Sequence, residues 1–502
     1  MPKTTISLRL IACVATLIIT ALAAPSAASA SSSQLSMIQE DRRLFGQTGE
    51  NPNDVMREIR SLGVDMIRTN VIYGKVYRTP RDRTKPAGFV TSDPNSPQYD
   101  WSAVDGLVNA ARANGIQILM TITTPGPFFS STQPSRCRSV PCSWKPNPVE
   151  FGQYAAAVAK RYAGRVDYYS IGNEFNLDPP GTWFTPRYAR SGRTKYEFAA
   201  ATYRKMFIAG QKAIAANDSS RRNRVLFGET SAIASPLPFL RAALCIDDKG
   251  KPFKGKRARL QGCTGRVAKL NIGGFAVHPY NQGGNGTPRQ RTRRKTALPM
   301  AHMPRLYKLM SQAVRRRRIP GGRGVFLTEF GFQSRPPDRI SNVTLAKQAQ
   351  YINEADRLFY GDRRIKTVNQ FELTDPPELD QFNMGLRFTS GGKKPSYDAY
   401  RVPIVVTRRS SRSVEVYGEV RPHRLLAGGP TTQVAIQVSS GGGAFTTVKN
   451  QRTNSRGFIK TNISRAGASR ARWRLVWQNP DTGELVTSRV AKAGKKLVYY
   501  KN

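Results

Sequence analysis

The sequence predicts an α/β fold: a (β/α)8 TIM barrel followed by a C-terminal all-β, sandwich-like domain. Its 502 residues exceed what one ordinary core requires, so a large domain and a smaller one are expected. From residue 42 to about residue 400, short apolar runs rich in β-forming residues alternate with longer segments of helical spacing. After Pro403 the helical spacing disappears, and short alternating segments remain. Hydrophobic residues make up 39% of the chain, which argues against a wholly disordered protein.

Eight apolar runs are the expected strands of the barrel, and six segments with helical spacing lie between them. The strands are expected at residues 43–46, 66–72, 117–123, 166–173, 225–229, 274–279, 324–330 and 367–373. The helices are expected at 52–62, 103–113, 148–162, 196–216, 299–316 and 344–360, with a weaker candidate at 236–244. The alternative is an open doubly wound sheet, which usually has a Gly-rich phosphate turn after its first strand. The segment Gly46-Gln47-Thr48-Gly49 has no such pattern, so the barrel is favoured.

The last hundred residues show period-two alternation at 414–417, 433–438 and 472–477, separated by turns at 441–443 and 479–483. This pattern is typical of a small antiparallel β-sandwich. The expected organisation is therefore a signal peptide (1–30), a barrel domain (31–402) and a small accessory β-sandwich domain (403–502).

The N-terminus has the features of an export signal. Lys3 and Arg9 form a basic start, an apolar stretch runs from residue 10 to about 24, and Ala28-Ser29-Ala30 offers an A-x-A cleavage site. The alternative is an uncleaved membrane anchor, but the stretch is shorter than the roughly 20 residues of a membrane span. We therefore expect a secreted, extracellular protein, associated at most with the cell envelope and without stable membrane insertion after signal removal.

Cysteine usage agrees with export. Cys13 lies in the signal, and an even number remains. Four cysteines in a secreted chain suggest disulfides with three possible connectivities. The local pairing Cys137–Cys142 and Cys245–Cys263 is favoured because each pair brackets a Pro- or Gly-containing loop. No metal site and no cofactor are expected, since neither pair has C-x-x-C spacing and the three histidines are scattered.

The chain is strongly basic, with 79 Lys and Arg against 33 Asp and Glu and a formal net charge of +46. Such a charge makes nucleic acid or an anionic polymer the first partners to consider. The basic runs at 221–224, 293–295 and 315–318 lie in expected loops or at helix ends, so we interpret them mainly as a solvated face. Nucleic-acid binding is not expected, because no known module and no basic stretch interleaved with aromatics is present.

Two expected strands end in a glutamate. Glu174 follows Asn173 at the end of the fourth strand, and Glu329 closes the seventh. In a barrel, polar residues at the C-terminal ends of strands face the active-site mouth. Either glutamate alone is equally explained by a structural ion pair. Two facing carboxylates suit the cleavage of a glycosidic bond, by retention at a separation of about 5 Å and by inversion at a wider one.

The Asn173-Glu174 pair and Thr328-Glu329-Phe330-Gly331 resemble the acid/base and nucleophile motifs of the clan A glycoside hydrolases, most of all the cellulase-like family 5 and family 39 groups. The resemblance covers about 70% of the chain. It implies that Glu174 is the general acid/base, that Glu329 is the nucleophile and that Asn173 binds the sugar 2-hydroxyl.

Other positions match the clan more loosely. Arg68 resembles the arginine that keeps the nucleophile ionised, and His278 with Tyr280 resembles the sixth-strand pair that orients nucleophile and substrate. Glu229, at the end of the fifth strand, is either a substrate ligand or, by slight preference, an ion-paired residue.

The aromatic residues depart from the clan pattern. The eighth strand has no Trp as a sugar-stacking floor, so Phe371 or Gln370 is expected there. Trp144 and Trp183 are candidate subsite residues, although packing under a loop explains them equally well, and Trp101 is expected to pack at a helix start.

The sequence thus favours a secreted retaining glycoside hydrolase that acts on a polysaccharide or glycoconjugate. The O-glycosidic bonds that it cleaves are expected to be β-linked. Two alternatives stay open: a non-catalytic carbohydrate-binding barrel, and a basic surface protein that binds an anionic cell-wall polymer. The expected partner is a carbohydrate substrate, with an anionic cell-envelope polymer as a second candidate.

Overall fold

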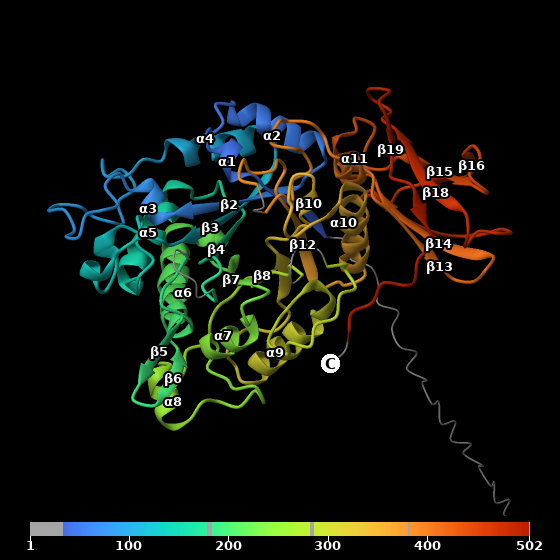
Figure 1. Ribbon diagram of the computed structural model, residues 1–502. Coiled ribbons are helices and arrows are strands. Elements are labelled where there is room, and N and C mark those ends of the chain that lie inside the picture. Colours follow the sequence, from blue (N-terminus) through green and yellow to red (C-terminus); the bar gives the residue numbers. More distant parts are fainter. Residues whose placement is uncertain (1–33, 178–182, 282–285, 380–381, 501–502) are drawn as a thin grey trace, which may run out of the picture.

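The computed structural model describes residues 34–177, 183–281, 286–379 and 382–500. The expected signal peptide, residues 1–30, lies outside these ranges. The large N-terminal part and the smaller C-terminal part lie side by side in Figure 1, where the C-terminal strands are orange to red.

Eight parallel strands form a closed barrel, as the alternation of strands and helices predicts. The first strand pairs with both the last and the second, which closes the sheet. In order around the barrel the strands are β1 (Leu35–Gln39), β12 (Ile365–Phe371), β9 (Gly324–Leu327), β8 (Gly274–His278), β7 (Val225–Ser231), β4 (Tyr168–Ile171), β3 (Gln117–Thr123) and β2 (Met66–Ile72).

The expected first strand is wrong. Residues 43–46 are not a strand; the barrel begins earlier, at β1 (Leu35–Gln39), and a short helix, α1 (Asp41–Leu44), follows. The segment Met37-Ile38 supplies one side chain to the barrel interior and one to the surrounding helices, as period-two alternation requires. Arg43 instead pairs with Glu50 at 2.6 Å, outside the barrel.

The expected helices are present, most of them within two residues of their predicted ends. Asn51 and Asn147 cap the helices that follow them: each side chain accepts a backbone N–H two residues later, and each precedes a Pro. The helix expected at 299–316 begins only at Pro304, because a 3-10 turn occupies Met300–His302. The helices that follow α1 are α2 (Pro52–Ser61), α3 (Tyr73–Val76), α4 (Ser102–Ala113), α5 (Pro148–Arg161), α6 (Phe198–Asn217), α7 (Pro236–Ala243), α8 (Gly255–Leu260), α9 (Pro304–Arg315), α10 (Leu345–Tyr360) and α11 (Pro395–Arg401).

Apolar side chains close one part of the barrel interior and leave polar side chains at the C-terminal strand ends. One cluster consists of inward-facing residues from six strands, all buried: Met37, Met66, Leu119, Leu226, Ala276 and Phe326. A larger cluster packs the other face of the strands against the helices. The barrel is therefore a filled core and not a pore, and its strands fix the positions of the polar side chains that follow them.

Two short two-stranded pairs, one antiparallel and one parallel, and two antiparallel sheets complete the described chain. Beside the barrel lie the antiparallel pair β5 (Tyr188–Ser191) with β6 (Thr194–Glu197), and the parallel pair β10 (Ser334–Arg335) with β11 (Val343–Thr344). The C-terminal sheets consist of β13 (Ile404–Arg408), β14 (Ser413–Glu419) and β17 (Phe458–Ser464), and of β16 (Thr446–Arg452), β15 (Gln433–Ser439), β18 (Arg472–Gln478), β19 (Leu485–Thr487) and β20 (Ala491–Lys492).

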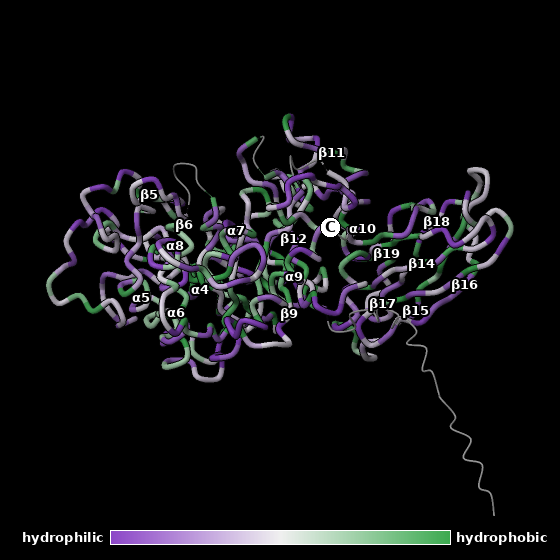
Figure 2. The backbone as a smooth tube through the Cα atoms, turned by 90° about the horizontal axis from the view of Figure 1, so that it is seen from below, coloured by the Kyte–Doolittle hydropathy of each residue, from purple (hydrophilic) through white to green (hydrophobic). Residues whose placement is uncertain are grey.

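The two C-terminal sheets share one hydrophobic core, in which Trp473 and Trp477 are fully buried. In Figure 2, green hydrophobic segments run through strands β14 and β18, whereas purple dominates many outer loops. This arrangement agrees with the predicted sandwich-like domain.

The C-terminal part is attached to the barrel by ion pairs and by the end of the chain. Arg421 pairs with Asp356 at 2.8 Å, and Arg401 pairs with Glu484 at 2.7 Å. Beyond β20 the chain returns to the barrel, where the Tyr500 N–H donates to the carbonyl of Ala301 at 2.8 Å. Tyr500 thus contacts the barrel domain.

Both locally paired disulfides are present, Cys137–Cys142 and Cys245–Cys263. In the part of the chain that the structure describes, none of the helices combines the length and apolar character that a membrane crossing needs.

We predict that removing Cys245–Cys263 destabilises the protein more than removing Cys137–Cys142. The bridges join residues 18 and 5 positions apart. Because the longer loop loses more chain entropy when it is closed, the expected losses in unfolding free energy are about 3 and about 2 kcal/mol. Denaturant unfolding of the two double Cys→Ala variants measures this order, and the reverse order would contradict it.

Candidate active site

A pocket of about 510 Å³ opens at the C-terminal ends of the barrel strands. It is lined by residues from the ends of β1, β2, β4, β7, β8, β9 and β12 and from the loops that follow them. The lining residues are Gln39, Asn70, Asn173, Glu174, Leu177, Trp183, Ser231, Ile233, Tyr280, Asn281, Glu329, Gln333, Ser341, Phe371, Phe382 and Met384.

Glu174 and Glu329 lie together in this pocket. One carboxylate oxygen of each, together with one ring nitrogen of His278, forms a group in which all atoms lie within 4.8 Å of one another. Glu174 follows β4 and Glu329 follows β9, so the two glutamates come from nearly opposite sides of the barrel. The barrel therefore brings together two carboxylates that are 155 positions apart in the sequence.

Arg68, from β2, lies beneath the carboxylates and is fully buried. Its Nη1 donates to Glu329 at 2.6 Å, and its Nη2 donates to Asn173 at 2.6 Å and to Glu229 at 3.1 Å. It also donates to Gln39. One guanidinium thus fixes side chains from four other strand ends, and its planar fork suits carboxylate partners.

His278 bridges the carboxylates at the end of β8. Its Nε2 lies 2.8 Å from Glu229, its Nδ1 lies 2.8 Å from Glu174, and the same Nδ1 lies 3.5 Å from Glu329. The Thr328 hydroxyl donates to the same Glu229 oxygen at 2.8 Å. Glu229 is therefore an ion-paired residue, fully buried behind the pocket, which agrees with the preferred sequence interpretation.

The buried charges shift one another's pKa values. Burial lowers the pKa of His278, but the carboxylates of Glu329, Glu174 and Glu229 outweigh it and raise that pKa from 6.5 to about 9. Burial raises the pKa of Glu229, but Arg68 and His278 outweigh it and lower that pKa to about 2. His278 is accordingly protonated and Glu229 ionised at neutral pH.

Glu329 experiences opposing influences. Burial raises the pKa of Glu329 above its ordinary value, although the charges of His278 and Arg68 act to lower it. Burial also raises the pKa of Tyr280 well above 10, so its hydroxyl keeps its proton and donates to Glu329 at 3.2 Å. Glu329 thus receives hydrogen bonds from Arg68 and Tyr280, both of which favour its charged form.

Glu174, His278 and Glu329 lie close enough together to be considered as metal ligands. A protonated imidazole has no free lone pair, however, and both ring nitrogens of His278 already face carboxylates. The arrangement is that of an imidazolium between carboxylates.

The backbone turns sharply where the glutamates leave their strands. Glu174 and Glu229 have positive φ values of 47° and 43°, a conformation that is uncommon for residues with side chains. The Glu174 N–H donates to the Glu229 carbonyl at 2.7 Å, which joins the two turns. Gly228 is required beside them, since a Cβ there would lie 2.5 Å from the carbonyl oxygen of Ala276.

The aromatic residues considered from the sequence as sugar-binding candidates lie in different places. Trp183 and Phe371 line the pocket. Trp144 is not among the lining residues; it lies beside the Cys137–Cys142 bridge, and its indole N–H donates to Gln133 at 3.1 Å. Trp101 packs at the start of α4 against Tyr99, as expected.

Of the two residues expected at the end of the eighth strand as a substitute for a stacking Trp, one lines the pocket and the other does not. Gln370 is buried and donates to the carbonyl of Met384 at 2.8 Å, which leaves Phe371 as the residue of this strand end that lines the pocket.

Several lining residues were not expected from the sequence. Gln39 was missed because the first strand was placed too late; the polar run Gln39-Glu40-Asp41 after Met37-Ile38 was the available signal. Asn70 and Asn281 are both buried, and their side-chain oxygens have no hydrogen-bond partner among the residues that the structure describes. Buried oxygens of this kind, at the wall of a pocket, are suited to accept hydrogen bonds from a hydroxylated ligand.

Comparisons with known proteins concern the fold. No family model and no protein of curated function matches the sequence. Similar solved structures include a family 39 glycoside hydrolase from the gut symbiont Bacteroides cellulosilyticus WH2, with 15% identity and a TM-score of 0.49 over 87% of this chain and 80% of that chain. A monomeric beta-xylosidase from Caulobacter crescentus CB15 has 15% identity and a TM-score of 0.48, over 86% of this chain and 94% of that chain.

A family 39 enzyme from Xanthomonas axonopodis pv. citri has 13% identity and a TM-score of 0.46, over 88% of this chain and 93% of that chain. Family 39 glycoside hydrolases are thus among the solved structures to which this chain is similar. At these identities the likeness concerns the fold alone.

We predict that Glu229→Gln lowers the pKa of His278 from about 9. The substitution removes a negative partner 2.8 Å from the imidazole. Protonated His278 stabilises the folded state fully below about pH 6.5, and this contribution is lost as the pH rises through about 9; in the variant the loss begins at lower pH. NMR titration of the imidazole nitrogens measures the shift.

The matched control is Glu197→Gln, which breaks the buried pair of Glu197 with Arg187 elsewhere in the chain. Both variants are expected to lose about 3–5 kcal/mol of unfolding free energy, because each removes a buried carboxylate that pairs with a buried arginine. Only Glu229→Gln is expected to change the titration of His278, and an unchanged titration would overturn the assignment.

Proposed function

We propose that the protein is a secreted retaining glycoside hydrolase. It cleaves O-glycosidic bonds, expected to be β-linked, in a polysaccharide or glycoconjugate. The observation that carries the proposal is the pair Glu174 and Glu329, with an oxygen of each within 4.8 Å at the mouth of a parallel barrel. Retaining glycosidases hold their two carboxyl groups about 5–5.5 Å apart, whereas inverting enzymes leave room for a water between them. The two disulfides agree with an extracellular location.

In the first step, Glu174 donates its proton to the glycosidic oxygen while a carboxylate oxygen of Glu329 attacks the anomeric carbon. The bond from that carbon to the glycosidic oxygen breaks, and the aglycone leaves as an alcohol. The sugar is then held as an ester on Glu329, and Glu174 is left as a carboxylate. The imidazolium of His278, 2.8 Å from Glu174, stabilises this new negative charge.

In the second step, Glu174 removes a proton from a water molecule, and the water oxygen attacks the anomeric carbon. The ester bond to Glu329 breaks, so both glutamates return to their starting states. The two displacements each invert the anomeric carbon, and the product keeps the configuration of the substrate.

The surrounding residues favour these roles. Arg68 and Tyr280 donate hydrogen bonds to Glu329 at 2.6 and 3.2 Å, and these contacts stabilise its carboxylate form against the effect of burial. Asn173 is fixed through its side-chain oxygen by Arg68, which leaves its amide N–H groups for the sugar 2-hydroxyl. Phe371 and Trp183 offer faces for stacking of sugar rings.

The aglycone side of the pocket follows from the position of the acid. Because Glu174 protonates the leaving oxygen, the aglycone lies next to Glu174 and to the neighbouring Leu177, whose N–H donates to the Glu174 carbonyl at 2.9 Å. Trp144 lies outside the lining residues and is proposed only as part of a more distant subsite, beside Gln133.

We predict that Glu329→Gln reduces the hydrolysis of an aryl glycoside substrate by at least about 10⁴-fold, since the amide cannot form the ester. The substrate is first identified by screening the wild-type protein on a panel of aryl glycosides and polysaccharides. Glu484→Gln, which changes a half-exposed glutamate in the C-terminal domain, is the control and is expected to retain activity. Circular dichroism verifies that both variants fold.

Undiminished turnover by Glu329→Gln would remove the nucleophile assignment. Proton NMR of the anomer first released by the wild-type enzyme tests retention separately. Release of the inverted anomer would contradict the double displacement even if both glutamates are essential.

A second prediction concerns Glu174→Gln. Loss of the general acid is expected to slow the hydrolysis of alkyl glycosides by about 10²–10⁴-fold and that of dinitrophenyl glycosides much less, because a dinitrophenolate leaves without protonation. Comparison of kcat/KM across leaving groups of decreasing pKa measures the effect. An equal loss for all leaving groups would argue against the acid role.

A further inference from the structure

A hollow of about 980 Å³ lies in the C-terminal domain, on the outer face of the sheet β16-β15-β18. Its floor is set by strand register: Ala435 pairs with Asn450 on one side and with Val476 on the other. The small side chain of Ala435 leaves space between longer neighbours. The walls are the loops before β15 and after β18, which are joined by a hydrogen bond from the Ala427 N–H to Asp481 at 2.8 Å.

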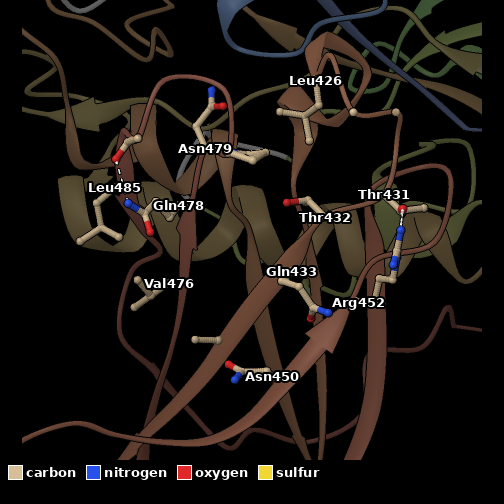
Figure 3. A pocket seen from close by; sticks show the side chains of 15 residues that line it. Leu426, Thr431, Thr432, Gln433, Asn450, Arg452, Val476, Gln478, Asn479 and Leu485 are labelled. Carbon is tan, nitrogen blue, oxygen red and sulfur yellow. Dashed lines mark hydrogen bonds between the residues drawn. The ribbon is translucent and has the colours of Figure 1, made fainter.

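Hydrogen-bonding side chains surround this floor. Gln433, Asn450 and Gln478 are exposed in the hollow, and Asn479 and Thr431 belong to its walls. Figure 3 shows the side chains of Gln433, Asn450 and Arg452 close together, with the bond between Arg452 and Thr431 drawn as a dashed line. The amide and hydroxyl groups offer both donors and acceptors, as the hydroxyls of a sugar require.

Two arginines on this face are held in place by neutral partners. Arg452 donates to the Thr431 hydroxyl at 2.7 and 3.1 Å. Arg474 lies two residues from Val476 on the same face, donates to Gln437 at 2.8 Å and covers the ring of Phe445 at 4.3 Å. Within the described ranges, neither guanidinium forms an ion pair. Their charges are therefore oriented and not neutralised.

The acidic residues of the domain are engaged elsewhere. Residues 403–502 contain 18 basic and 4 acidic side chains. Glu415 pairs with Arg357 at 2.7 Å, Glu419 with Arg421 at 3.4 Å and Glu484 with Arg401 at 2.7 Å. Asp481 accepts the Ala427 N–H. Each of the four is thus committed to holding the fold.

We propose that this hollow is a second carbohydrate-binding site, one that takes an acidic polysaccharide whose carboxylates pair with Arg452 and Arg474. The amides of the hollow bind the sugar hydroxyls, and a planar guanidinium binds a carboxylate in two parallel hydrogen bonds. Arg452 pairs with Gln433 of β15, and Arg474 pairs with Gln437 of the same strand. These two positions lie four residues, or about 13 Å, apart along β15, so a ligand that reaches both arginines is a chain and not a single sugar.

A nucleic acid fits the hollow less well. Single-stranded nucleic acids bind through bases stacked on aromatic side chains. No aromatic residue lines the hollow, and the nearby ring of Phe445 is covered by Arg474. The site is distinct from the pocket of Glu174 and Glu329, and it holds or fails independently of the proposed hydrolysis.

The test uses the full-length protein and soluble polygalacturonate as the probe, at one fixed low salt concentration. Arg452→Gln/Arg474→Gln is expected to weaken binding roughly tenfold, because two oriented charge-assisted hydrogen-bonding groups are lost. The matched control is Arg408→Gln/Arg412→Gln, which removes two exposed charges from the strands and turn of the other sheet. It is expected to change binding by less than about twofold, as for exposed charges in general.

A second variant tests the hollow without changing charge. Ala435→Phe fills the floor and is expected to weaken binding as much as the double variant does, while the thermal unfolding midpoint stays close to that of the wild type. Neutral dextran and a single-stranded oligonucleotide serve as comparison ligands.

If both double variants weaken polygalacturonate binding equally, the binding is a general attraction to the basic surface, and the proposed site is wrong. Full binding by a folded Ala435→Phe protein would overturn the site in the same way. Binding of dextran as tight as that of polygalacturonate would overturn the acidic class. Binding of the oligonucleotide that is equally tight, and equally reduced by Ala435→Phe, would assign the hollow to nucleic acid instead.

Discussion

The arrangement of the pocket depends on the burial of Arg68. A guanidinium without access to water requires partners for its charge, and Arg68 finds them in Glu229 and Glu329. His278 adds a second buried positive charge that bonds Glu229 on one side and Glu174 on the other. Removing any one of these five side chains takes a charged partner from its neighbours in a low-dielectric interior, so the positions of all five depend on one another.

This constraint explains why a barrel is needed. The five residues come from five strands, and only closure of the sheet between β1 and β12 brings the ends of β2, β4, β7, β8 and β9 around one point. The sharp turns at Glu174 and Glu229 then aim one glutamate into the pocket and the other behind it. The same residue type therefore serves two purposes: Glu174 and Glu329 reach the pocket, while Glu229 fixes the charges beneath them.

The sequence predicted most of the barrel because segments such as Met66–Ile72 and Gln117–Thr123 are short, contain many β-forming apolar residues and lie between segments of helical spacing. It misplaced the first strand, since Leu44-Phe45 is as apolar as Met37-Ile38 and only pairing with β12 distinguishes them. Glu174 and Glu329 were recognisable from their strand ends. Asn70 and Asn281 were not, because a polar residue near a strand end is ordinary until the fold shows that its oxygen is buried and has no partner among the described residues.

The high positive charge of the surface arises partly because several acidic residues are buried inside the protein. Glu229, Asp356, Asp375 and Glu415 are buried and paired with basic side chains, so these carboxylates do not reach the surface to balance its arginines. Net charge alone therefore says little about where an anion binds. A more informative feature is an arginine such as Arg474, which is oriented by a neutral amide and an aromatic ring and keeps its charge available. That distinction separates a defined anion site from the general basicity of the chain.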